Sequence, residues 1–161
     1  MNESFRYVAD HGLGAEKDYP YVSGILPVPP GGLPPVLPCA KDAKKDVIKS
    51  HTIGYVNMKP NSKPSLLAAV ARIGPVSVAL NGGSQAFQHY GKGVLDSGCP
   101  PTINHGVLAV GYEMDADKPY YLVKNSWGTG WGEEGYIKIA IDDSADGVCG
   151  ILLDPSCPIP A

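Results

Sequence analysis

Hydrophobic residues fall at helical spacing in two short stretches in the first half of the chain. In the first stretch, Phe5, Val8 and Ala9 share one helical face. Asn2 can cap this helix, and Gly12 is placed to end it. The pattern therefore predicts a short amphipathic helix near the start of the chain.

The second helical stretch begins where Asn61 or Ser62 can act as a cap and Pro64 falls in the first turn. The Gly74-Pro75 pair is expected to stop this helix, because proline cannot continue it. Four apolar residues are expected on its buried side: Leu66, Leu67, Val70 and Ile73.

After residue 75 the helical spacing gives way to short runs of β-branched, aromatic and small apolar residues. Glycine, proline and aspartate clusters separate these runs, as expected for strands joined by turns. The predicted strands are residues 76–80, 106–112, 120–124 and 136–141. A small helical part therefore precedes a β-rich part, which is typical of the α+β class.

A turn-rich link at residues 113–119 is short enough to make the two middle strands an antiparallel hairpin. If the hairpin is symmetric about Asp115, His105 lies opposite Asn125, and opposed Cβ atoms are about 4.5–5.5 Å apart. The Asn125 amide oxygen can then accept an imidazole N–H, and Trp127 falls on the same face. Fixing one ring nitrogen leaves the other free to take a proton, so His105 is a candidate general base.

Composition and charge exclude several classes of function. The chain has 161 residues and 43% hydrophobic content, enough for one ordinary core. A net charge of −3, with no basic run longer than Lys44-Lys45, predicts no nucleic-acid or membrane partner. No apolar stretch approaches the roughly 18–20 residues of a spanning helix. Polar residues 1–4 do not fit a secretory signal, so we expect a cytosolic protein or one whose true beginning is absent.

The four cysteines, Cys39, Cys99, Cys149 and Cys157, lie far apart and form no CxxC pair or close Cys/His cluster. We therefore expect no bound metal and no cofactor. Their even number and wide spacing suit disulfides in an oxidising compartment, while buried reduced thiols in a cytosolic protein are the alternative.

Several longer stretches resemble the papain family of cysteine peptidases. NHGVLAVGY and KNSWGTGWGEEGYIKI are similar to the histidine and asparagine regions of that family. AFQHYGKGVL and DGVCGI resemble the segments around two of its cysteines, and FRYVADHG and DYPYVSG extend the resemblance toward the start. Nearly the whole chain is covered, and the main departure is the insertion at residues 23–39.

The resemblance implies a papain-like fold of two parts. Residues 56–161 would form the right-hand β-barrel domain that carries the histidine and asparagine of the active site. Residues 1–55 would be a remnant of the helical left-hand domain, without the N-terminal helix that carries the nucleophile. Residues 23–39 contain six prolines and three glycines, so we read them as a surface loop or linker with polyproline character.

The resemblance also implies roles for single residues. His105 would be the general base paired with the catalytic thiolate, Asn125 would orient its ring, and Trp127 would shield their hydrogen bond. The backbone of Asn104 would hydrogen-bond substrate beside the scissile bond. On position alone, the alternative is that His105 is a histidine at a strand end with its hydrogen bonds satisfied, and that Asn125 is a turn residue.

Four positions match the family's pocket for the substrate residue second from the cut: Ala79, Ile103, Gly106 and, at its floor, Asp154. An acid at the floor resembles cathepsin B, which accepts basic side chains as well as apolar ones for Coulombic reasons. A solvated surface aspartate is the alternative for Asp154.

The resemblance implies a disulfide between Cys99 and Cys149. Cys39 matches a structural cysteine of the first domain whose partner would lie outside this chain. Cys157 would either pair with Cys39 or stay free.

No segment of the chain matches the family's Cys-Gly-Ser-Cys-Trp-like motif or its upstream oxyanion-binding glutamine. We therefore expect a fragment of a papain-like endopeptidase that has no peptidase turnover alone. Its expected partners are a peptide or protein substrate and a missing N-terminal chain or segment. The resemblance implies a secreted or lysosomal/vacuolar location, although the chain contains no targeting segment.

Two other functions stay open from the sequence. A non-enzymatic homologue would keep one wall of the cleft and bind peptides or another protein. A serine hydrolase using Ser126 or Ser97 has no nucleophile elbow in its favour, and strand alternation directs Ser126 away from His105. Sequence upstream of Met1 separates the fragment from the homologue.

Overall fold

The computed structural model describes residues 1–22 and 52–160. Cys39, residues 23–39 and any pairing that involves Cys39 lie outside the described residues. The helices are α1 (Asn2–His11), α2 (Lys63–Arg72), α3 (Gln85–Gln88) and the 3-10 turn η2 (Val148–Gly150). The strands are β1 (Thr52–Asn57), β2 (Val76–Leu80), β3 (Val94–Leu95), β4 (His105–Glu113), β5 (Tyr120–Lys124), β6 (Tyr136–Ala140) and β7 (Ser156–Pro160).

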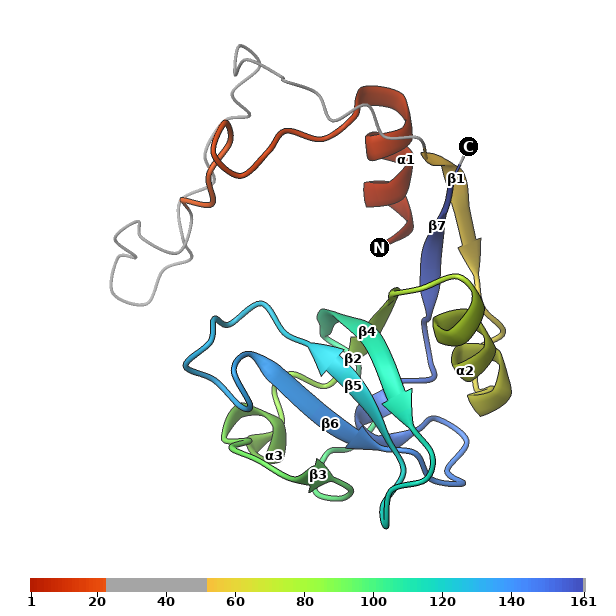
Figure 1. Cartoon of the computed structure of the whole chain (residues 1–161), viewed down its shortest axis with the longest axis vertical. Coiled ribbons are helices and arrows are strands. Elements are labelled where there is room, and N and C mark those ends of the chain that lie inside the picture. Colours follow the sequence, from red (N-terminus) through yellow and green to blue (C-terminus); the bar gives the residue numbers. More distant parts are fainter. Residues whose placement is uncertain (23–51, 161) are drawn as a thin grey trace.

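The described strands form one seven-stranded sheet in the order β1-β7-β2-β4-β5-β6-β3. All neighbours are antiparallel except β3 and β6, which are parallel. The sheet is open, because β1 and β3 are its two edges and do not pair with each other. Figure 1 shows α1 beside β1 and β7, apart from the strands β2, β4, β5 and β6.

The hairpin of β4 and β5 is present, but its predicted register is wrong. Symmetry about Asp115 would set Leu108 opposite Leu122, whereas Leu108 pairs with Lys124. The strands close at Glu113 and Tyr120, so the turn is centred beyond Asp115, and a bulge after Ala109 shifts the register again. The shift on the His105 side of the bulge is two residues, which keeps the side chains there on their predicted face because strands alternate with a period of two.

Three strands, β1, β3 and β7, lie outside the predicted set. The reason why β7 was not predicted is clear. Its sequence SCPIP contains Pro158 and Pro160, which donate no backbone hydrogen bond. β7 pairs with β2 only through Ser156, so past that residue β1 is its one partner in the sheet. Proline is tolerated where one edge of a strand is unpaired, and this condition depends on the topology.

The second helix, α2, begins and ends as predicted, with the Ser62 hydroxyl accepting from the backbone N–H of Ser65. Its buried residues are Leu66, Ala69 and Val70. The prediction for Ile73 is wrong, since 53% of that residue is exposed. The helix already ends at Arg72, so Ile73 is its C-cap residue and turns off the buried face.

The first helix, α1, begins at Asn2 with Met1 as its N-cap residue, and Gly12 ends it at φ 72°. Asn2 is therefore inside the helix, and no side chain caps it. None of its residues is buried. Its main anchor is Tyr55 of β1, whose ring stacks against Phe5 at 6.3 Å between centroids and whose hydroxyl accepts from Arg6 at 3.1 Å.

The core packs against β2, β4, β5 and β6, where strand alternation sends one row of apolar side chains to the interior. No helix among residues 1–22 and 52–160 is long and apolar enough to cross a membrane. The largest fully buried side chains include Leu66, Val76, Leu80, Phe87, Tyr121, Val123, Ile137 and Ile139.

Candidate active site

A hydrogen bond joins the two candidate catalytic side chains. His105 is the first residue of β4 and Asn125 directly follows β5, so the hairpin brings them together. His105 Nε2 lies 2.8 Å from Asn125 Oδ1. That oxygen also accepts the backbone N–H of Ser126 at 2.8 Å, which fixes it as the acceptor. Nε2 therefore carries the proton, and Nδ1 is left to accept one.

The asparagine of this pair is held firmly. Asn125 is only 7% exposed, and its backbone N–H donates to the carbonyl of Gly135 at 2.9 Å. Its side-chain Nδ2 is buried and has no hydrogen-bond partner among the described residues. The amide is thus fixed by its oxygen and its backbone rather than by its NH₂ group.

Two aromatic rings flank the imidazole. The Trp127 ring lies 5.1 Å from the His105 ring between centroids, and 42% of Trp127 is exposed. Phe87 of α3 is fully buried and meets His105 edge-on at 5.9 Å. The sequence did not reveal Phe87, because a four-residue helix is too short to show a periodic apolar face.

A glycine behind the histidine is a second residue that the sequence analysis missed. A Cβ atom on Gly82 would lie 2.6 Å from the Cβ of His105, which no real pair of such atoms tolerates. The Gly82 N–H donates to Asn104 Oδ1 at 2.9 Å, so the turn after β2 packs directly against the start of β4. The Gly82-Gly83 doublet after a predicted strand is the signal that could have indicated a close backbone approach.

Asn104 is engaged on several sides. Its backbone N–H donates to Leu80 O at 2.9 Å, and its side chain contacts Gly82 N and Asn81 Oδ1. A substrate contact by its backbone, as predicted, must therefore use the carbonyl oxygen.

The predicted substrate pocket is brought together in part. Ala79 and Gly106 face each other across β2 and β4. Ile103 is 40% exposed and lies against η2, where a Cβ on Gly150 would meet it at 3.0 Å. Asp154 is half-buried between η2 and β7, and no hydrogen bond or ion pair among the described residues joins it to the other three.

The predicted disulfide between Cys99 and Cys149 is present, with an S–S distance of 2.06 Å. It closes a loop of 50 residues, which corresponds to about 3–4 kcal/mol of stabilisation by chain entropy. Asn81 forms hydrogen bonds near both cysteines of the disulfide. Its backbone N–H donates to Cys149 O, and its side-chain Nδ2 donates to Pro100 O, next to Cys99. The disulfide therefore supports the turn that packs against His105.

The remaining described cysteine, Cys157, is free and buried in β7. Burial raises the pKa of its thiol, so the thiol stays protonated at neutral pH. A buried protonated thiol is inert as a nucleophile.

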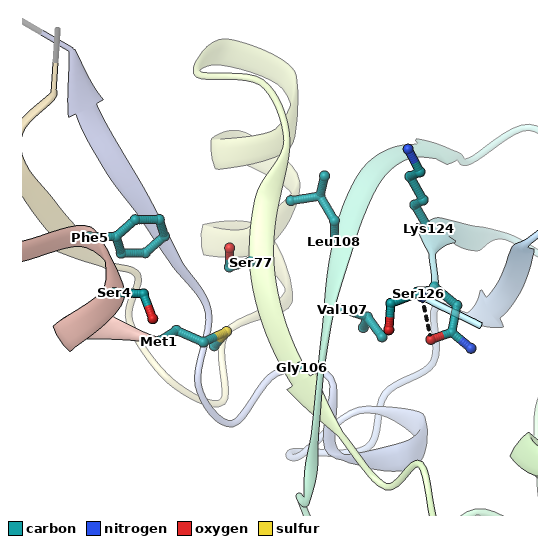
Figure 2. A pocket seen from close by; sticks show the side chains of 10 residues that line it. Met1, Ser4, Phe5, Ser77, Gly106, Val107, Leu108, Lys124 and Ser126 are labelled. Carbon is teal, nitrogen blue, oxygen red and sulfur yellow. Dashed lines mark hydrogen bonds between the residues drawn. The ribbon is translucent and has the colours of Figure 1, made fainter. Parts of the chain in front are cut away.

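A largely apolar cavity of about 430 Å³ adjoins Asn125 (Figure 2). In Figure 2, Met1, Ser4 and Phe5 of the α1 region face Gly106 and Val107 of β4 across this space. Among residues 1–22 and 52–160, no group of three or more His, Cys, Asp or Glu side chains could hold a metal ion. The remaining lining residues are Ser77, Leu108, Lys124, Asn125 and Ser126.

A histidine held through Nε2 by an amide oxygen, with Nδ1 left as an acceptor and an indole alongside, is an arrangement that suits a general base. Residues 1–159 match the family described as papain family cysteine protease, and the chain belongs to that family.

Two relatives show how much of the family's length is present. The KDEL-tailed cysteine endopeptidase CEP2 of Arabidopsis thaliana is 39% identical over 166 residues, which cover 99% of this chain and 41% of that protein. The Arabidopsis thaliana cysteine proteinase RD21A is 38% identical over 99% of this chain and 32% of its own length. The chain thus spans less than half of these curated relatives.

A solved structure confirms the predicted papain-like α+β fold. The Carica candamarcensis cysteine protease CMS1MS2, in complex with E-64, matches with a TM-score of 0.81 and 35% identity. The match covers 99% of this chain and 67% of that chain. In the described residues the sheet remains open, so the expected barrel is present as an unclosed sheet.

Proposed function

We propose that this chain carries the general base of a papain-like cysteine endopeptidase and that a segment outside the chain supplies the nucleophile and the oxyanion-binding group. The observation that carries the proposal is the 2.8 Å bond from His105 Nε2 to Asn125 Oδ1, which leaves Nδ1 as the proton acceptor. Peptides and proteins are the substrates of this family.

In the proposed reaction, His105 Nδ1 takes the proton of a thiol, and the thiolate attacks the carbonyl carbon of the scissile bond. The imidazolium then gives the proton to the leaving amine as the C–N bond breaks. Water, deprotonated by the same nitrogen, hydrolyses the thioester and releases the thiol. Asn125 keeps Nε2 protonated and the ring oriented throughout, and the Trp127 and Phe87 rings limit the access of water to this bond.

Two observations support an external source for the thiol. Cys99 and Cys149 are joined to each other, and Cys157 is buried with a raised pKa. The cavity between the α1 region and β4 reaches Asn125, so it offers space for another segment next to the residue that holds the base.

Completing the domain tests this function. We expect that fusing the part of the Carica protease that this chain does not cover to the N-terminus of this chain yields alkylator-sensitive hydrolysis of a fluorogenic dipeptide. His105→Ala should then reduce kcat/KM by about 10³-fold, because general acid–base catalysis is lost. Ser97→Ala is the control, since Ser97 is exposed and its hydroxyl donates to exposed Asp96, and it should leave the rate unchanged.

Turnover that survives His105→Ala would sink the proposed mechanism. A folded completed domain that binds peptides without turnover would instead favour the non-enzymatic homologue.

We also propose that Ala79, Ile103, Gly106 and Asp154 shape the site for the substrate residue second from the cut, with Asp154 attracting a basic side chain. In the completed domain, Asp154→Ala is expected to lower kcat/KM about tenfold for arginine at that position and to leave leucine substrates unchanged. Asp117→Ala, which removes an exposed acid from the β4–β5 turn, is the matched control. Equal losses for both substrates would argue against a charge role.

An oxidising secretory route for the chain is a further part of the proposal. It is supported by the Cys99–Cys149 disulfide and by a KDEL-tailed relative, since such a tail is a signal for retention in the endoplasmic reticulum. Non-reducing mass spectrometry of the native protein should find the two cysteine peptides joined; free thiols at both positions would contradict it.

A further inference from the structure

The carboxylate of Glu133 joins its own loop to two other segments, the one that contains Tyr90 and Gly93 and strand β6. Glu133 Oε1 lies 2.8 Å from the Tyr90 hydroxyl and accepts the Gly93 N–H at 3.0 Å. The same hydroxyl lies 2.5 Å from Gly93 O, so its one proton is shared between these two acceptors. Its other oxygen, Oε2, accepts from Lys138 Nζ of β6 at 2.8 Å. The Glu133 and Lys138 side chains are only 34% and 29% exposed, so this ion pair is partly shielded from water.

The charges in this cluster favour the donor and acceptor roles seen. The Lys138 ammonium, and then the Tyr90 hydroxyl, lower the pKa of Glu133, so its carboxylate is ionised at neutral pH. Burial, and then the bond to Glu133, raise the pKa of Tyr90, so the phenol stays a donor. A carboxylate that accepts three such bonds fixes the positions of all three donors.

Aromatic contacts connect this cluster to the imidazole. The Tyr90 ring lies 5.7 Å from the Trp131 ring, and Trp131 lies 5.4 Å from Trp127. Trp127 in turn lies 5.1 Å from His105. Trp131 is fixed in direction by its Nε1–H, which donates to Gln88 O at 3.1 Å. Tyr90 is therefore in contact with the indole pair that borders His105.

The backbone of the same loop holds the asparagine. Glu133 and Tyr136 exchange backbone hydrogen bonds of 2.9 and 3.0 Å, and the Gly135 carbonyl receives the N–H of Asn125 at 2.9 Å. A Cβ on Gly132 would lie 2.5 Å from Tyr136 O and 3.1 Å from Tyr90, so the loop packs against the Tyr90 ring without an intervening side chain. The loop that carries Glu133 thus contacts both members of the catalytic pair, through Trp127 and through Asn125.

We infer that Glu133 is a positioning residue for the candidate site. Its carboxylate fixes Tyr90 and Lys138. Through them it keeps the Trp131–Trp127 pair and the Asn125 backbone in place beside His105. The catalytic role of that site rests on the proposed function, whereas the positioning by Glu133 can be measured without turnover.

The chain offers a direct readout of this cluster. It has two tryptophans, Trp127 and Trp131, so fluorescence excited selectively at tryptophan reports on this indole pair without the nine tyrosines. We expect Glu133→Gln to raise acrylamide quenching about twofold and to shift the ring ¹⁵N signals of His105, because the Lys138 ammonium then faces an amide. Glu134→Gln is the matched control: it makes the same change one residue away, at an exposed side chain.

A second variant keeps the test decisive if Glu133→Gln does not fold. Tyr90→Phe removes only the hydroxyl and keeps the ring contacts, and it should shift both signals in the same direction by a smaller amount. A lowered melting temperature with quenching and His105 signals as in the unmodified chain, in either folded variant, would overturn the positioning role. If the variants alter these signals but the completed domain with an unchanged Glu133 shows no turnover, the positioning role stands and the proposed peptidase is refuted.

Discussion

Purified alone, the chain is expected to show no peptidase turnover on a fluorogenic dipeptide substrate. On the proposed function, His105 supplies the base and a segment outside the chain supplies the nucleophile, so the chain alone should form no acyl intermediate. The residual rate that triad mutants keep comes from the oxyanion hole and substrate binding, and we expect the oxyanion-binding group to be absent as well. The measurement compares the chain with its own His105→Ala variant at high enzyme concentration, and the two progress curves should coincide.

Cleavage that iodoacetamide blocks would contradict this expectation. Two further variants would then locate the thiol, since Cys157→Ser tests the buried cysteine and Cys39→Ser tests the one outside the described residues. The completed domain serves as the positive control for the assay, because it contains the same His105 and Asn125.

Gly82→Ala is expected to displace His105 although the added group is a single methyl. The new Cβ would lie 2.6 Å from the Cβ and 2.8 Å from the Cγ of His105, and the Leu80–His105 pairing of β2 and β4 leaves the backbone little freedom to retreat. Overpacking of this kind destabilises a fold by about 1–3 kcal/mol. A displacement of the base by about 1 Å lowers the rate of a completed domain by about 100-fold.

Gly54→Ala is the matched control, because a Cβ at that position meets nothing within 4 Å. Both variants should be compared by kcat/KM in the completed domain and by the His105 ¹⁵N signals in the chain alone. If Gly82→Ala left the His105 ¹⁵N signals and kcat/KM unchanged, the close approach of the turn to the imidazole would not matter for function.

Local sequence patterns were sufficient to predict the elements that are specified by neighbouring residues. Strands β2 and β5 and helix α2 lie where alternation, caps and the Gly74-Pro75 stop placed them. The pairing of His105 with Asn125 could also be predicted, although the register was off by two residues, because a two-residue slip keeps the face. The bulge after Ala109 could not be predicted, since it depends on how two strands twist together.

The supports of the site were not visible in the sequence because each depends on a distant segment. Phe87 reaches His105 across 18 positions of the chain, and Glu133 reaches Tyr90 across 43. β7 is a strand despite its prolines only because β1 pairs with it along one edge.

Periodicity and turn residues act over a few positions, so they were enough to predict the α+β character of this protein, its hairpin and the pairing of His105 with Asn125. The held nitrogen of His105, the close approach of Gly82 and the contacts that fix the indole pair became visible only in the folded chain. Those properties are distances between segments, and a distance between segments is set by packing the whole core.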